Sequence, residues 1–288
     1  MLKKRVIAIV LVQNGLVVQS IGFREYLPVG NAEIAIEFLN DWGVDEIILL
    51  DITATRNSRD PDLSLIQRVA KHCLVPLTVG GGIHRLEQAR DLIRSGADKV
   101  SFNHSTLTNK EVLFRTADVF GSQCVVASID AVKTKSNYRV YDYLNHHATA
   151  NTPAKFAADL ANQGVGEILI NSVDRDGSKL GFDLELVKSV CQTVNVPVIC
   201  CGGAGKPEHF ISAFKNTNVH AAAAANFFHF TEHSVTTTKS IMRPEVAIRH
   251  DTSANYNKSS FDEDGRLKKK SDQFLEDLLF ERIEKEVI

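Results

Sequence analysis

Aspartates stand at the ends of predicted strands at three points of the chain, Asp51, Asp130 and Asp176. A carboxylate in such a place can act as a general acid or base, or it can cap a helix or bond to a loop. Asp130 follows the apolar run VVASI, and we favour a chemical role for it. The run VIAIVLVQNG at residues 6–15 is similar to VVASIDAVKT at residues 125–134, but it carries Leu11 where the later run carries Asp130.

Two glycine-rich segments, GGGIH at residues 80–84 and CGGAGK at residues 201–206, each follow a predicted strand and precede a predicted helix. Glycine lets backbone N–H groups approach an anion, and the N-terminus of the following helix adds positive potential. One such segment could serve only a tight turn. Two of them at related strand ends favour a ligand with two phosphate groups.

Short β-branched runs alternate with amphipathic segments, which is typical of a parallel sheet covered by helices. We predict strands at 6–12, 46–51, 76–79, 99–102, 123–129, 167–171, 197–201 and 221–225. We predict helices at 31–42, 63–72, 86–95, 154–163, 184–193 and 207–216. Eight strand units in about 230 residues predict an α/β fold of the (β/α)8 TIM-barrel class, with a doubly wound open sheet as the alternative.

An internal repeat supports a barrel built from two half-barrels. The segment WGVDEIILL at residues 42–50 is echoed by QGVGEILIN at residues 163–171, and VPLTVGGG at 75–82 by VPVICCGG at 196–203. Both pairs are offset by 121 residues, about half the length of one barrel. At a slightly different offset, Leu11 and Asp130 occupy equivalent places in the two halves.

The composition excludes several classes of protein. The formal net charge of −2 recruits neither nucleic acid nor an anionic membrane, and no stretch approaches the ~20 apolar residues of a membrane span. Five cysteines without C-x-x-C pairs indicate reduced thiols in a cytoplasmic protein. No histidine or cysteine spacing predicts a metal site, and we expect no cofactor.

The chain divides into a barrel at residues 1–249 and a linker with a C-terminal helix at residues 250–288. Residues 274, 275, 278, 279 and 283 form an apolar helical stripe, with Ser271 as the expected N-cap. This helix is expected to fold back on the barrel, or alternatively to dock on a partner. A polar insertion at 135–152, which contains three tyrosines and the pair His146-His147, is predicted to be a solvent-exposed loop.

Charged residues begin several of the predicted strands, at the end of the barrel opposite the strand-end aspartates. Arg5, Glu46 and Lys99 hold such positions. Considered on their own, these three residues would be interpreted as ordinary surface charge.

Long signatures in the same order give the chain a resemblance to the HisF family, the cyclase subunits of imidazole glycerol phosphate synthase. The resemblance covers residues 1 to about 250. It is carried by MLKKR, DEIILLDITAT (45–55), PLTVGGGIH (76–84), GADKVSFN (96–103), FGSQCVVASID (120–130), GEILINSVDRDGSKLGFD (166–183) and GGAGKPEHF (202–210). The family implies a barrel of two halves with a HisH-like glutaminase docked beneath it. Ammonia from the glutaminase passes through the barrel to a substrate with two phosphates, which is cleaved and cyclised.

The resemblance also implies roles for individual residues. Asp130 matches one of the two catalytic aspartates of the family, and Asp98 matches an acidic residue that signals to the glutaminase. The phosphate-binding positions are Gly82, Asn103, Asp176, Gly177 and Gly203, and the ammonia-channel positions are Arg5, Glu46, Thr78 and Lys99. The match at the channel replaces the interpretation of these charges as ordinary surface residues.

Several positions at the upper end of the barrel depart from the family pattern. The first catalytic aspartate is Leu11, and leucine can neither carry a proton nor accept a hydrogen bond. Further departures are Gln19 for a lysine, Asn171 for a threonine, Cys201 for a serine, and His104 and Asn226 for hydroxyl residues near the phosphates. The sequence therefore predicts loss of the cyclase with the ammonia passage kept.

This combination resembles HisF-like paralogues of surface-polysaccharide biosynthesis, which feed ammonia to a separate sugar amidotransferase that makes acetamidino groups. The opening VLVQNGLVV and the tail FDEDGRLKKK…EVI add to that likeness. Two alternatives stay open at this point. One is a working cyclase of histidine biosynthesis that tolerates Leu11, and the other is a scaffold or regulatory barrel without ammonia flux.

Overall fold

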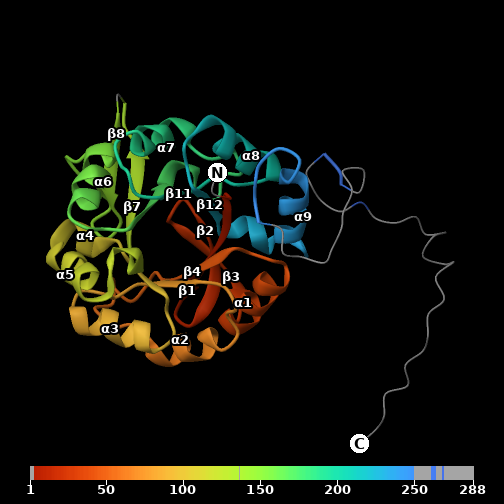
Figure 1. The fold of residues 1–288 in the computed structure, drawn as a ribbon. Helices are drawn as coiled ribbons and strands as arrows, with labels where there is room; N and C mark the ends of the chain where they lie inside the picture. The colour runs from red at the N-terminus through yellow and green to blue at the C-terminus, as the bar shows by residue number, and fades with distance from the viewer. Residues whose placement is uncertain (1–2, 136, 250–260, 264–267, 269–288) are drawn as a thin grey trace, which may run out of the picture.

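The computed structural model describes residues 3–135, 137–249, 261–263 and 268. Within them, eight parallel strands close into a barrel, and the last strand pairs with the first (Figure 1). Around the barrel these are β1 (Arg5–Gln13), β4 (Glu46–Asp51), β5 (Leu77–Gly80), β6 (Lys99–Phe102), β7 (Val125–Lys133), β10 (Glu167–Ser172), β11 (Val198–Cys201) and β12 (Ala221–Ala224). Each strand begins within two residues of its predicted start. The (β/α)8 barrel is confirmed, and the open sheet is excluded.

Helices surround the barrel (Figure 1). In the described residues they are α1 (Ala32–Asp41), α2 (Leu63–Ala70), α3 (Leu86–Arg94), α4 (His104–Thr108), α5 (Glu111–Phe120), α6 (Pro153–Asn162), α7 (Leu184–Cys191), α8 (Pro207–Asn216) and α9 (Ser234–Met242). Short 3-10 helices lie at Ser122–Cys124, Val173–Arg175 and Asn226–His229. The six predicted helices are confirmed as α1, α2, α3, α6, α7 and α8, whereas α4, α5 and α9 were not predicted.

Alternation of side chains along each strand divides the apolar residues between two cores. The first core fills the barrel interior, and we call it the inner column. It consists of Ile7, Ile9, Ile48, Val126, Leu169, Ile199, Ala221 and Ala223, joined by the partly buried Leu11, Leu50, Cys201 and Ala225. The intervening strand residues, such as Val6 and Val10 of β1, pack outward into the larger core beneath the helices. Complete burial of one such aliphatic side chain contributes about 1.5–3 kcal/mol.

Two antiparallel hairpins extend the barrel strands above their C-terminal ends. β2 (Leu16–Ile21) pairs with β1 through the turn Asn14-Gly15, where both residues have positive φ, and then with β3 (Glu25–Gly30). This is the backbone that an Asn-Gly turn favours. β8 (Tyr138–Asp142) pairs with the end of β7 and with β9 (His147–Ala148).

The second hairpin corrects the prediction that 135–152 is a solvent-exposed loop. Tyr138 is buried, and its hydroxyl donates to Asp183. Tyr143 lines the main pocket of the barrel. His146 and His147 are exposed, as predicted. The hairpin was not predicted because its strands are short. Its tyrosines were also counted as polar residues, although their rings are apolar enough to be buried.

The predicted C-terminal helix at 271–288 and its linker fall almost entirely outside the described residues. The described chain leaves α9 and forms a bridge between Ile248 and Lys4 beside β1. None of the helices in the described ranges is long and apolar enough to cross a membrane.

A buried ion pair fastens the last helix to the first strands. Lys239 of α9 lies 2.7 Å from Asp45, and both side chains are 1% exposed. The other carboxylate oxygen of Asp45 accepts the backbone N–H of Val6 at 2.7 Å. The pair therefore joins α9 to the start of β4 and to β1. Helix α9 was not predicted because it contains several threonines, and β-branched residues have low helix propensity.

Lys239→Met should lower the free energy of unfolding by about 3–5 kcal/mol, because it leaves the carboxylate of Asp45 buried without its cation. Equilibrium unfolding in urea measures the change. Lys215→Met is the matched control, since Lys215 pairs with Glu245 at the surface, and it should change stability by less than about 1 kcal/mol. Equal effects of the two substitutions would contradict the role given to the buried pair.

Candidate functional site

The C-terminal ends of the barrel strands surround one large pocket, which we call the upper pocket. Ser20 of β2, Tyr26 of β3 and Tyr143 of the β8 hairpin contribute to its lining. Of the residues predicted for chemistry or phosphate binding, it contains Asp130, Asn103, Gly82 and Asp176. Leu11, where the resemblance predicts an aspartate, lines the same pocket. The structure therefore brings residues together that lie more than 150 positions apart in the sequence.

Asp130 projects from β7 and is 5% exposed. Its two carboxylate oxygens accept hydrogen bonds from the side-chain amides of Asn103 at 2.8 Å and Asn171 at 3.2 Å. Burial raises the pKa of Asp130 to about 6, although the two amides oppose that rise. A carboxyl group that titrates so close to neutral pH is suited to general acid–base work.

Leu11 lines the same pocket from β1, four strands around the eight-stranded barrel from β7. Its side chain joins the top of the inner column beside Leu50, Cys201 and Ala225. The place where a second carboxylate would face Asp130 is therefore apolar.

The other carboxylates of the pocket are already engaged. Asp51 accepts the backbone N–H groups of Thr53 and Ala54 and pairs with Arg59 at 2.6 Å. Asp176 accepts the Ser20 hydroxyl at 2.7 Å and the Phe23 N–H at 3.2 Å. Both carboxylates therefore bond to loop or hairpin groups, which was the alternative to a chemical role for each strand-end aspartate.

The predicted phosphate-binding glycines have backbones that only glycine tolerates easily. Gly82 and Gly203 have φ values of 75° and 100°, and a Cβ atom would lie 2.6 Å and 2.2 Å from the nearest carbonyl oxygen. Gly177 and Gly203 line a smaller pocket with Lys179, together with the first residues of the 3-10 helix Asn226–His229. The Gly82 N–H, however, donates to the Thr55 hydroxyl at 3.1 Å. Phosphate binding at these positions stays a prediction.

Asn226 acquires a role that the sequence did not reveal. Its amide oxygen accepts the Ser20 N–H at 3.0 Å, and its amide nitrogen donates to the Ser20 carbonyl at 2.6 Å. This reciprocal pair attaches β2 to the segment after β12, while the Gly22 N–H donates to the Asp176 carbonyl at 3.2 Å. The first hairpin is therefore fixed over the upper pocket from two sides.

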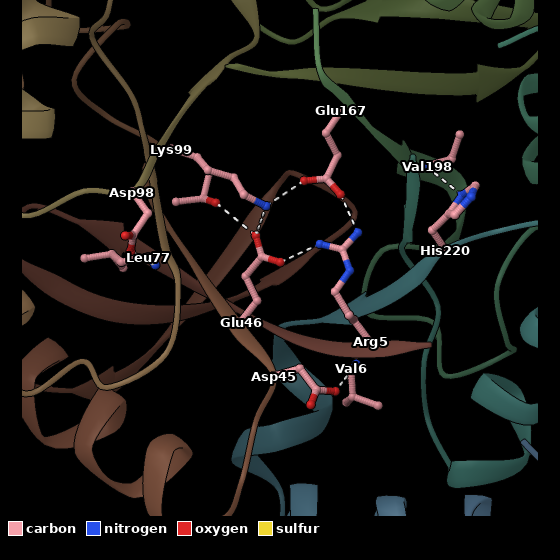
Figure 2. Close-up of polar contacts among 11 residues, drawn as sticks. Arg5, Val6, Asp45, Glu46, Leu77, Asp98, Lys99, Glu167, Val198 and His220 are labelled. Atoms are coloured by element: carbon pink, nitrogen blue, oxygen red, sulfur yellow. Dashed lines mark hydrogen bonds and ion pairs between the residues drawn. The ribbon is translucent and has the colours of Figure 1, made fainter. Parts of the chain in front are cut away.

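A ring of four charged side chains closes the opposite, lower end of the barrel (Figure 2). Arg5 donates to Glu46 at 2.6 Å and also to Glu167, while Lys99 donates to Glu46 at 2.5 Å and to Glu167 at 2.9 Å. We call these four residues the charge ring. Glu167 was not predicted as a member of this ring. The internal repeat aligns Glu167 with Glu46 at an offset of 121 residues and could have revealed it.

Mutual pairing favours the charged forms of Lys99 and Glu167 despite their burial. Burial alone would lower the pKa of Lys99, but Glu167 and Glu46 raise it above its usual value. Burial would raise the pKa of Glu167, but Arg5 and Lys99 hold it below its usual value. Each carboxylate has two cations, so neither acid is left unpaired in the barrel.

The inner column separates the charge ring from the upper pocket. Thr78, which is fully buried on β5, lies just above the ring, and its hydroxyl donates to Glu46 at 3.4 Å. Ser101 and Ser128 continue the polar positions on β6 and β7 and line the upper pocket. The remaining strands contribute aliphatic side chains, alanine and Cys201. An uncharged molecule therefore meets a mostly apolar interior between the two ends.

Side chains at the lower face also cap neighbouring strands. Asp98 accepts the Leu77 N–H at 2.8 Å, and His220 Nδ1 accepts the Val198 N–H at 3.3 Å (Figure 2). Asp98 is exposed, and its contact with a glutaminase stays a prediction. No group of three or more histidine, cysteine, aspartate or glutamate side chains within the described ranges could hold a metal ion.

Comparison with known proteins gives a consistent result over most of the chain. A family model described as "Histidine biosynthesis protein" matches residues 5–234. The "Putative imidazole glycerol phosphate synthase subunit hisF2" of Vibrio vulnificus is 41% identical over 267 residues, which cover 92% of this chain and 98% of the relative. The HisF subunit of imidazole glycerol phosphate synthase from Geobacillus kaustophilus is 40% identical over 245 residues, 84% of this chain and 97% of the relative. The HisF subunit of Streptococcus sanguinis is 39% identical, again over 84% and 97%.

The raised pKa of Asp130 predicts a pH dependence of stability. An unfolded aspartate titrates near 3.9, so folded Asp130, with its pKa of about 6, holds its proton more tightly. The stability that it contributes is fully present below pH ~4 and is lost as the pH rises through about 6. Asp130→Asn should therefore gain about 1–3 kcal/mol relative to the unmodified protein between pH 4 and pH 7.

Denaturant unfolding at both pH values measures this gain. Asp118→Asn at an exposed position of α5 should show no such pH-dependent difference. A difference between Asp130→Asn and the unmodified protein that is the same at both pH values would contradict the pKa shift.

Proposed function

The chain belongs to the histidine biosynthesis protein family that includes the HisF subunits, and on that basis we propose that it conducts ammonia for a glutamine amidotransferase complex without acting as a cyclase. Its direct partner in this proposal is a HisH-like glutaminase at the lower face. Ammonia enters through the charge ring, crosses the inner column and leaves through the upper pocket.

The physical case for ammonia rests on charge. Free ammonia is neutral and can enter a mostly apolar column, whereas ammonium would have to leave water at a cost of several kcal/mol. Direct passage also protects the nucleophile from protonation in bulk solvent. Thr78, Ser101 and Ser128 offer hydroxyl groups to the molecule in transit, without a charge that would trap it.

The charge ring supplies the point of control. Arg5 and Lys99 each bridge the same two carboxylates, so displacing one cation still leaves both acids paired with the other. A docking partner can therefore open one side of the ring without stranding a buried charge. The side chains of Arg5 and Lys99 are 24% and 18% exposed, so they are the members that a partner at the lower face can reach.

Leu11 is the single observation that carries the loss of cyclase chemistry. A cyclase with an acid and a base needs two titratable groups across the pocket, and the residue that lines it four strands away from Asp130 is the aliphatic Leu11. Loss of one general acid or base typically costs 10²–10⁴-fold in rate. Asn171 reinforces the change, because its amide binds the remaining carboxylate of Asp130.

The ammonia that leaves the upper pocket needs an acceptor enzyme. We infer a separate sugar amidotransferase of surface-polysaccharide biosynthesis that makes acetamidino groups. This inference rests on the likeness to HisF-like paralogues in the opening segment and in the tail. A relative named hisF2 is compatible with a second, divergent copy of the subunit.

A second candidate function is the one in the names of the relatives, an active imidazole glycerol phosphate synthase cyclase subunit. The environment of Asp130 favours it, because a buried carboxyl with a pKa of about 6 is well placed to move a proton. The two glycine loops also keep their backbone geometry.

Cyclase turnover separates the two candidates. With the bisphosphate ribulosyl substrate of the family and saturating ammonium salt, we expect turnover at least ~10²-fold below that of an authentic HisF, because Leu11 cannot transfer a proton. Leu11→Asp restores the missing carboxyl group and should raise turnover. Product formation by the unmodified protein at a rate close to the control would establish the second candidate.

Lys99→Ala should lower the yield of aminated product per glutamine hydrolysed in the reconstituted complex of barrel, glutaminase and acceptor enzyme. The truncation removes one of the two cations of the charge ring and lets ammonia escape at the lower end. Activity with added ammonium salt should stay unchanged. Lys133→Ala, which removes an exposed ion pair with Glu185, is the control. An undiminished yield from Lys99→Ala would remove the gate from the proposal.

A further inference from the structure

Asp98 and His220 occupy equivalent places in the two half-barrels. Asp98 precedes β6, the fourth strand around the barrel from β1, and His220 precedes β12, the eighth. Each side chain accepts the first N–H of the strand before it in sequence, that of Leu77 in β5 and that of Val198 in β11 (Figure 2). Both side chains are exposed, and they flank the charge ring from opposite sides of the barrel.

The hydrogen bond to Val198 fixes the chemical state of His220. Since Nδ1 accepts an N–H, it must keep its lone pair, and the proton of the neutral imidazole resides on Nε2. Burial, together with the charges of Lys4 and Arg5, lowers the pKa of His220, which maintains the neutral ring at physiological pH. Nε2 makes no hydrogen bond to the described part of the chain and is left as a donor.

We propose that His220 is a specificity-determining contact for the glutaminase, in which Nε2–H donates to a carboxylate of that partner. This inference rests on the proposed function, which places the glutaminase at the lower face. Asp98, on the other side of the ring, can only accept hydrogen bonds when ionised. The two strand caps thus offer opposite polarity, and a partner must present a donor at one side and an acceptor at the other.

The surroundings of His220 explain why the partner group is a carboxylate. Lys4 donates to the Val219 carbonyl at 2.6 Å, next to His220, and Arg5 begins the neighbouring strand β1. Both cations favour an anion beside the imidazole. These charges therefore disfavour a glutaminase that presents a basic group at this place. They also disfavour binding of the correct glutaminase in a wrong orientation.

His220→Asn separates partner contact from strand capping. The asparagine side-chain oxygen can replace Nδ1 as the acceptor for Val198, but the amide does not extend to the position of Nε2. With the full-length protein and its HisH-like glutaminase, we expect about tenfold weaker binding in titration calorimetry and an unchanged melting temperature. Glutaminase stimulation at saturating barrel should equal that of the unmodified protein, because the charge ring is intact.

Two further variants complete the test. His220→Asp should weaken binding more than His220→Asn, since its carboxylate repels the proposed partner group. His72→Asn, at another exposed histidine in the segment between α2 and β5, should leave binding unchanged.

The outcomes separate this inference from the function on which it rests. If the unmodified protein binds and stimulates the glutaminase but His220→Asn binds equally well, His220 is only a strand cap and the inference is wrong. If the unmodified protein neither binds nor stimulates the glutaminase, the proposed function itself fails.

Discussion

The structure depends on the requirement that charges inside a barrel be paired. Glu46 and Glu167 are almost fully buried, and an isolated carboxylate there would cost several kcal/mol. Arg5 and Lys99 meet this requirement by bridging both acids, which joins β1, β4, β6 and β10 at the lower end. The same four bonds form a continuous ring across the lower end of the interior (Figure 2). In the proposed function, the gate for ammonia consists of these same stabilising contacts.

The two half-barrels share a scaffold but not a distribution of charge. The acids of the ring obey the internal repeat, because Glu46 and Glu167 are offset by 121 residues. The cations do not, since Arg5 comes from the first strand of the barrel and Lys99 from the fourth. At the upper end the asymmetry is of another kind, with Asp130 in one half and Leu11 in the other. A symmetric fold thus carries four paired charges at its lower end, whereas at its upper end Asp130 of one half corresponds to the aliphatic Leu11 of the other.

Much of the architecture was predictable because the strands are continuous apolar runs. The start of every barrel strand was predicted within two residues. Three of the four ring positions, Arg5, Glu46 and Lys99, would be interpreted on their own only as surface charge. The sequence could not show that α9 is a helix, because its threonines are held by buried contacts such as the Thr236 bond to the Trp42 carbonyl. It could not show that Asn226 clamps β2, since the two segments lie 206 residues apart. Glu167 could have been predicted, because the internal repeat aligns it with Glu46.

Residues that face the interior recur at every second position along each strand, and this spacing has a genetic consequence. Arg5 and Leu11 share one parity on β1, as do Glu46 and Leu50 on β4, and Glu167 and Asn171 on β10. A single inserted or deleted codon within a strand would change the parity of one end relative to the other, so that the lining residues of one end would turn toward the helices. The residues that line the upper pocket can therefore change by substitution, whereas insertions and deletions are tolerated only in the loops between strands and helices. Leu11, Asn171 and Cys201, the predicted departures from the family pattern, would be substitutions in this sense, and a substitution leaves the lower end in register.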